Sequence, residues 1–215
     1  MENFWQFLKD LTNPESIIKL GMPLLLFVIF AETGLFVGFF LPGDSLVFIS
    51  GLLCATDHSL LKVNLPELLT FLSIAAILGN LTGYFFGWKV GMKLYNKKDS
   101  LLFKKRHLDA TRSFYERHGG KTIILGRFLP IIRTFAPILA GIIKIDIKKF
   151  MLYNVVGAIA WIGSIGSIGY FLGVKVPMIK QYLGIIVIAL IAITTLPVLL
   201  AYMRERKKNP RDGKE

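Results

Sequence analysis

The chain has 215 residues, 53% of them hydrophobic, with a mean hydropathy of +0.57 and a formal net charge of +12. Long apolar runs in such a chain exclude a soluble domain and predict an all-α integral membrane protein. Most of the excess positive charge lies in two blocks beside apolar runs, which indicates a topology signal rather than a nucleic-acid surface. The one cysteine, Cys54, excludes an intramolecular disulfide. The N-terminus lacks the basic start of a signal peptide, so we expect no removed leader.

The first region, 17–56, is apolar but is broken by Pro42 and Gly43, with an acid on each side of the break. These acids are Glu32 and Asp44. A charge at the centre of the hydrocarbon costs about 2.5 to 3.5 kcal/mol, so it needs a partner, water or a ligand. Broken backbone at membrane depth must be buried in protein or line a wet cavity. We therefore predict a re-entrant helical hairpin over 17–56. Whether its first arm crosses fully, and the side of the N-terminus, stay open.

The second region, 68–91, is a predicted transmembrane helix, and a basic segment over 92–121 follows it. A tilted helix needs roughly 20 apolar residues to cross about 30 Å of hydrocarbon, which this region supplies. The positive-inside rule predicts that the basic segment is cytoplasmic, whereas no Lys or Arg lies between Lys19 and Lys62. The helix over 68–91 is therefore expected to run from the outer side to the cytoplasm.

The third region, 122–143, is expected to enter and leave on the cytoplasmic side. It contains Arg127 and Arg133, and Pro130 and Pro137 interrupt it. A straight helix facing lipid does not accommodate two buried charges and two prolines. We predict a second re-entrant hairpin over 122–143, with Pro137 as a break.

Two further transmembrane helices are predicted over 150–174 and 181–203, followed by a basic tail over 204–215. The tail reads as cytoplasmic by the same rule as the basic segment. The prediction is thus a multi-pass protein whose C-terminus lies in the cytoplasm.

An internal repeat relates the two halves of the chain. The tripeptide FLP at 40–42 recurs at 128–130, and GYF at 83–85 recurs at 169–171. The two helices that carry GYF are predicted to run in opposite directions, which is typical of inverted repeats in transporters with a binding site at the midplane. The predicted fold is therefore all-α, with two opposed re-entrant hairpins in an inverted repeat plus about three full transmembrane helices.

Several ordered motifs resemble the bacterial DedA family of VTT-domain membrane proteins. The matching runs are FAETG at 30–34, FLPGDSL at 40–46, HGGK at 118–121, GRFLP at 126–130, RTFAP at 133–137 and AG at 140–141. The resemblance implies a protein of the bacterial cytoplasmic membrane, needed for envelope homeostasis and linked to the proton motive force. Members are implicated in moving phospholipids or undecaprenyl phosphate between leaflets. The family's acidic pair maps onto Glu32 and Asp44, and its arginine pair onto Arg127 and Arg133.

The residue types themselves are compatible with a site for an anionic lipid. Arginine is permanently charged and binds phosphate oxygens bidentately. A carboxylate, unlike arginine, can change its protonation state when burial raises its pKa toward neutrality, so Glu32 and Asp44 are the candidate proton carriers. The expected substrate-binding residues are Arg127, Pro130, Arg133 and Thr134.

Other interpretations remain beside this one. The four charges can form an ion-pair network that only fixes the hairpins. Asn80 and Asn154 lie within predicted spans, where hydrogen bonding between helices is favoured over substrate contact. Trp161 lies too deep in its span to be an interfacial anchor.

The rival functions are a proton-coupled transporter of a small solute and a membrane enzyme acting on lipid phosphates. The sequence has no HExxH or GxSxG motif, and its three histidines lie outside the apolar segments. We therefore expect no enzyme activity, metal or other cofactor. The expected partners are membrane lipids and protons, a homo-oligomer is compatible with the sequence, and nucleic acid is not expected.

Overall fold

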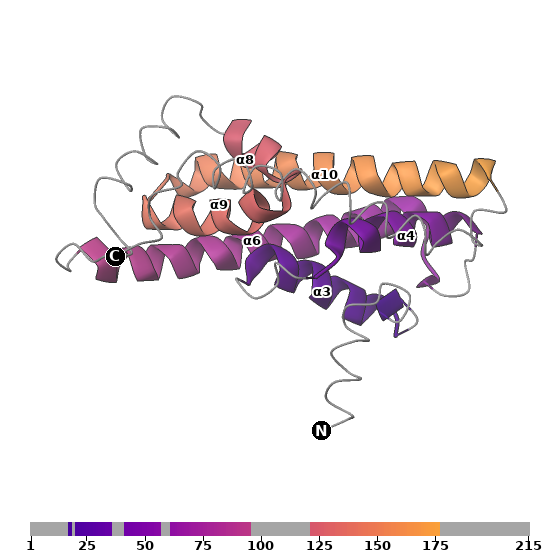
Figure 1. The fold of residues 1–215 in the computed structure, drawn as a ribbon, viewed down its shortest axis with the longest axis horizontal. Coiled ribbons are helices and arrows are strands. Elements are labelled where there is room, and N and C mark those ends of the chain that lie inside the picture. Colours follow the sequence, from indigo (N-terminus) through magenta and orange to yellow (C-terminus); the bar gives the residue numbers. More distant parts are fainter. Residues whose placement is uncertain (1–16, 19, 36–40, 57–60, 96–120, 177–215) are drawn as a thin grey trace, which may run out of the picture.

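The computed structural model describes residues 17–18, 20–35, 41–56, 61–95 and 121–176, and these contain α-helices and no β-strand (Figure 1). The all-α class is thus confirmed for this part of the chain. The helices are α3 (Met22–Gly34), α4 (Gly43–Thr56), α6 (Leu65–Tyr95), α8 (Lys121–Gly126), α9 (Pro130–Ile142) and α10 (Ile147–Lys175).

The two long helices begin at polar caps. Asn64 Oδ1 accepts from the backbone N–H of Glu67 at 3.0 Å, and Glu67 Oε2 accepts from the N–H of Asn64 at 3.0 Å. This reciprocal pair is a capping box, which satisfies N–H groups that have no partner inside α6. At the start of α10, the Asp146 side chain accepts from the N–H of Lys149 at 3.0 Å. Local capping therefore sets where both helices begin.

Residues Leu65–Gly91 of α6 and Ile147–Lys175 of α10 are long and apolar enough to cross a membrane. The outward face of α10 is itself apolar, since Leu152, Ile159 and Phe171 are 61%, 58% and 57% exposed. A helix in the core of a soluble protein buries such side chains, so this face fits lipid better than water. These helices match the spans predicted over 68–91 and 150–174. The predicted span 181–203, the tail and most of the basic segment lie outside the described residues.

Each long helix is preceded by a pair of short helices separated by a break. In the first pair α4 begins at Gly43, and the carbonyl oxygen of Pro42 accepts from Leu46 N–H at 2.9 Å. In the second pair α8 ends at Gly126, three residues form a turn, and Pro130 starts α9. A proline fits the first turn of a helix because its missing N–H would have no partner there. The structure therefore has a break at the proline of each FLP repeat, at Pro42 and at Pro130.

Pro137 was predicted as a break, and this prediction is wrong. Pro137 lies inside the continuous helix α9 and is buried. A proline in a helix interior removes one backbone hydrogen bond, here the one to the carbonyl oxygen of Arg133, without necessarily ending the helix. The break instead lies before Pro130, where the chain passes from α8 to α9.

The second short helix of each pair packs on the long helix of the opposite half. α4 packs on α10 and α9 packs on α6, toward opposite ends of the molecule in Figure 1. Glycines allow these close approaches. A Cβ at Gly51 of α4 would collide with the backbone of Gly166, and one at Gly169 of α10 would collide with the backbone of Phe48. A Cβ at Gly87 of α6 would collide with the backbone of Ile138 of α9.

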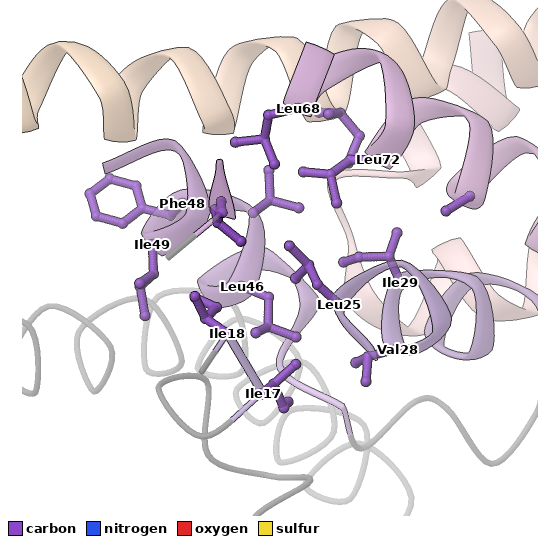
Figure 2. Packing of buried hydrophobic residues seen from close by; sticks show 14 of the residues in the cluster. Ile17, Ile18, Leu25, Val28, Ile29, Leu46, Phe48, Ile49, Leu68 and Leu72 are labelled. Carbon is purple, nitrogen blue, oxygen red and sulfur yellow. The ribbon is translucent and has the colours of Figure 1, made fainter. Parts of the chain in front are cut away.

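The larger hydrophobic core joins the first three described helices to α10. Figure 2 shows Leu25 and Ile29 of α3 and Leu46 of α4 beside Leu68 and Leu72 of α6. All five side chains are fully buried, so they fix α3 and α4 against the first half of α6. The core therefore holds in place the two helix ends that carry the acidic pair.

Candidate functional site

Three of the four predicted charged residues meet in one buried cluster. Arg133 Nη1 donates to Asp44 Oδ1 at 2.7 Å, and Arg133 Nη2 pairs with Glu32 Oε1. Arg133 and Glu32 are 3% and 1% exposed, whereas Asp44 keeps 14% of its side chain exposed. One guanidinium from α9 thus bridges a carboxylate from α3 and a carboxylate from α4.

Each of these residues lies at the end of a short helix. Glu32 is in the last turn of α3, Asp44 is the second residue of α4, and Arg133 is in the first turn of α9. The helix dipole favours an acid at an N-terminus, as at Asp44, and disfavours an acid at a C-terminus or a base at an N-terminus. The dipoles of α3 and α9 therefore disfavour the charges of Glu32 and Arg133, and the ion pair between the two residues compensates for this.

Gly43 makes room for the Glu32 carboxylate. A Cβ at position 43 would overlap the Glu32 carboxyl group, so any side chain other than hydrogen displaces it. The glycine predicted at the hairpin break therefore has a second role, which is close approach to the acidic pair.

Trp161 completes the cluster, and no role was predicted for it. Its Nε1–H donates to Asp44 Oδ1 at 2.8 Å, and its ring lies 4.4 Å from Arg133 Cζ. The first contact fixes the carboxylate and the second is a cation–π interaction. The signal available in the sequence was its place in the middle of a predicted span, where a tryptophan is not an interfacial anchor. In the structure its side chain is fully buried.

Arg127 lies in a different environment. Its Nη2 donates to Asn154 Oδ1. The orientation of the Asn80 amide follows from its hydrogen bonds: its oxygen accepts from the same Nη2 at 2.7 Å, and its nitrogen donates to the Thr33 carbonyl oxygen at 2.9 Å. Arg127 is 1% exposed, yet no carboxylate lies within ion-pair distance of it in the described ranges. Its Nε and Nη1 have no hydrogen-bond partner there either. The two arginines therefore share no partner in that part of the chain.

The amino-acid sequence matches the VTT domain family over residues 41–171, which is more than half of the chain. The chain belongs to the DedA family. Protein DedA of Escherichia coli (strain K12) is 40% identical over 208 residues, covering 95% of this chain and 94% of that protein. An uncharacterized membrane protein of Mycobacterium tuberculosis is 38% identical over 183 residues, covering 85% and 79%. The inner membrane protein YqjA of Escherichia coli (strain K12) is 30% identical over 184 residues, covering 85% and 80%. No solved structure matches the chain.

The resemblance read from the motifs is thereby confirmed at the level of the family. The name of one relative places that protein in the inner membrane. Together with two helices long enough to span a membrane, this supports an inner-membrane location for the present DedA-family chain.

The charged site lies halfway along the two long helices. Asn80 is the middle residue of α6, and Trp161 is the middle residue of α10. Asn154 Nδ2 also donates to the Ile77 carbonyl oxygen at 3.1 Å, which is a hydrogen bond between the helices of the kind expected for these asparagines. Their contact with Arg127 was not predicted.

Two other predicted residues flank Arg133. Thr134 is buried beside it. Pro130 begins α9, and its side chain lies outside the described part of the structure. Both therefore belong to the helix turn that presents Arg133, and their predicted role in binding substrate stays a prediction.

Proposed function

We propose that this DedA-family protein is a transporter that moves an anionic, phosphate-bearing lipid across the bacterial cytoplasmic membrane, coupled to protons. Undecaprenyl phosphate and phospholipids are the two candidate substrates. The observation that carries the proposal is the buried cluster of Arg133, Glu32 and Asp44, halfway along α6 and α10. Ionisable residues within transmembrane segments mark substrate and proton pathways more often than they serve as scaffolding.

The proposed topology has two re-entrant hairpins related as an inverted repeat, with the C-terminus in the cytoplasm. In support, α3 with α4 and α8 with α9 are both broken pairs, and each second helix packs on the long helix of the other half. Transporters with this kind of symmetry bind substrate where the halves meet. Arg133 of the second half and the acids of the first half meet at that boundary.

The proposed coupling step is protonation of the carboxylates. A protonated Glu32 or Asp44 no longer attracts Arg133 as an ion, so the contact between α9 and the first broken pair weakens. The helix pairs then separate, and the arginines of the opened site hold the lipid phosphate. Deprotonation on the other side restores the ion pairs and expels the anion.

The test uses proteoliposomes containing the purified full-length chain. Leaflet exchange of undecaprenyl phosphate and of an anionic phospholipid is measured with and without a pH gradient. We expect movement of one of these lipids to respond to the gradient, and the double variant Glu32→Gln, Asp44→Asn to lose that response. Gly163→Ala is the matched control, because a Cβ there meets nothing within 4 Å. Movement of neither lipid, or an unchanged gradient response in the double variant, refutes the proposal.

A further inference from the structure

The two arginines of the site differ in how their charges are compensated. Arg133 contacts two carboxylates, whereas among the described residues the hydrogen-bond acceptors of Arg127 are the amide oxygens of Asn80 and Asn154. Amide oxygens satisfy N–H groups without cancelling a positive charge. In the part of the chain that the structure describes, one buried guanidinium is therefore neutralised and the other is not.

The unpaired donors of Arg127 point to a missing acceptor. Its Nε and Nη1 have no partner among the described residues although the side chain is 1% exposed. A guanidinium group buried with N–H groups unsatisfied is unfavourable, and more so because the group is charged. Anionic oxygens satisfy both the donors and the charge, and phosphate matches the guanidinium plane especially well.

The helix that faces Arg127 leaves space for it. A Cβ at Gly157 of α10 would lie 2.9 Å from Arg127 Cδ and 3.1 Å from Nε. These contacts are tighter than ordinary van der Waals packing, so a side chain at 157 presses on the guanidinium stem. Glycine at this position keeps Arg127 in place between the two asparagines.

We propose that Arg127, framed by Asn80, Asn154 and Gly157, is the anion-binding group of the site and takes the lipid phosphate, while Arg133 serves as the partner of the carboxylates. This assignment rests on the proposed function and divides its two tasks between the arginines. Asn80 and Asn154 act as positioning residues, because they hold the guanidinium through neutral oxygens and leave its charge available.

The experiment measures thermal unfolding of the full-length chain in detergent during titration with three probes. Dioctanoyl phosphatidic acid carries the phosphate on a lipid, dioctanoylglycerol has the same chains without phosphate, and inorganic phosphate has no chains. We expect phosphatidic acid to raise the unfolding temperature of the wild type and dioctanoylglycerol not to do so.

The decisive variants place a charge or a methyl group beside Arg127. Asn154→Asp adds a carboxylate to an existing contact of Nη2, so it neutralises Arg127 and weakens phosphatidic acid binding by about tenfold or more. Asn154→Ala lowers the unfolding temperature without ligand, yet weakens binding less than the aspartate does. A purely structural role for Asn154 predicts the opposite order. Gly157→Ala weakens binding, whereas Gly163→Ala on the same helix does not.

The outcomes separate this inference from the proposed function. If phosphatidic acid binds to Asn154→Asp and to Gly157→Ala as strongly as to the wild type, the inference is overturned and the proposal of lipid transport still stands. Binding of inorganic phosphate alone, lost in Asn154→Asp, supports the anion site and refutes a lipid substrate. No binding of any phosphate probe to the wild type refutes both.

Discussion

Replacing Arg133 tests whether the two carboxylates depend on it. Arg133→Met removes the guanidinium but keeps an apolar stem of similar length, leaving Glu32 and Asp44 close together without a cation. Removing one partner of a buried ion pair costs about 3 to 5 kcal/mol. Since each 1.4 kcal/mol is a factor of ten, the folding equilibrium should fall by about two to four powers of ten.

The matched control is the neutral triple variant Glu32→Gln, Asp44→Asn, Arg133→Met. It removes the same cation together with the charges that the cation compensates, so it should recover at least half of the lost free energy of unfolding. The measurement is reversible unfolding in mixed detergent micelles, followed by tryptophan fluorescence. A triple variant as unstable as Arg133→Met alone refutes the reasoning, because the uncompensated carboxylates would then not be the source of the cost.

Three further predictions concern single contacts. Gly43→Ala should cost about 1 to 3 kcal/mol of stability by displacing Glu32, whereas Gly163→Ala should be neutral or stabilising; equal unfolding temperatures for the two variants would contradict the close approach at Gly43. Trp161→Phe keeps a ring over Arg133 but loses the donor to Asp44, so we expect a loss of about 1.5 to 3 kcal/mol; unchanged unfolding would mean that this hydrogen bond contributes nothing. Cys54 is buried, so maleimide should label it in denaturant and not in native membranes, and rapid native labelling would contradict its burial.

The charged cluster could largely be predicted from the sequence because charges stand out in apolar segments. Glu32, Asp44 and Arg133 each interrupt such a segment, and the cost of burying them predicts that each has a partner, water or a ligand. The breaks before Gly43 and Pro130 were predictable from the internal repeat, because the tripeptide FLP occurs at both. Pro137 was misjudged because a proline motif does not reveal whether neighbouring helices hold the backbone helical through it.

The neutral members of the site were harder to predict. Trp161 and Asp44 are 117 residues apart, and Asn154 and Arg127 are 27 apart, so only the packing of α10 brings these side chains together. Asparagine in a membrane helix usually hydrogen-bonds to another helix, and tryptophan usually lies at the membrane interface, so neither residue type indicates a buried charged site. The different surroundings of Arg127 and Arg133 likewise depend on which helix each one faces, and the spacing of the two residues in the sequence does not reveal the facing helix.

The ion pairs between the two halves also constrain how the chain is made. The ribosome delivers Glu32 and Asp44 well before Arg133, and no Lys or Arg lies between Lys19 and Lys62 to serve as a temporary partner. During synthesis the acids must stay hydrated or protonated, because their lasting counterion has not yet been translated. A chain stopped before Arg127 should therefore insert its first broken pair poorly and be degraded, and supplying the missing half as a separate polypeptide should rescue it.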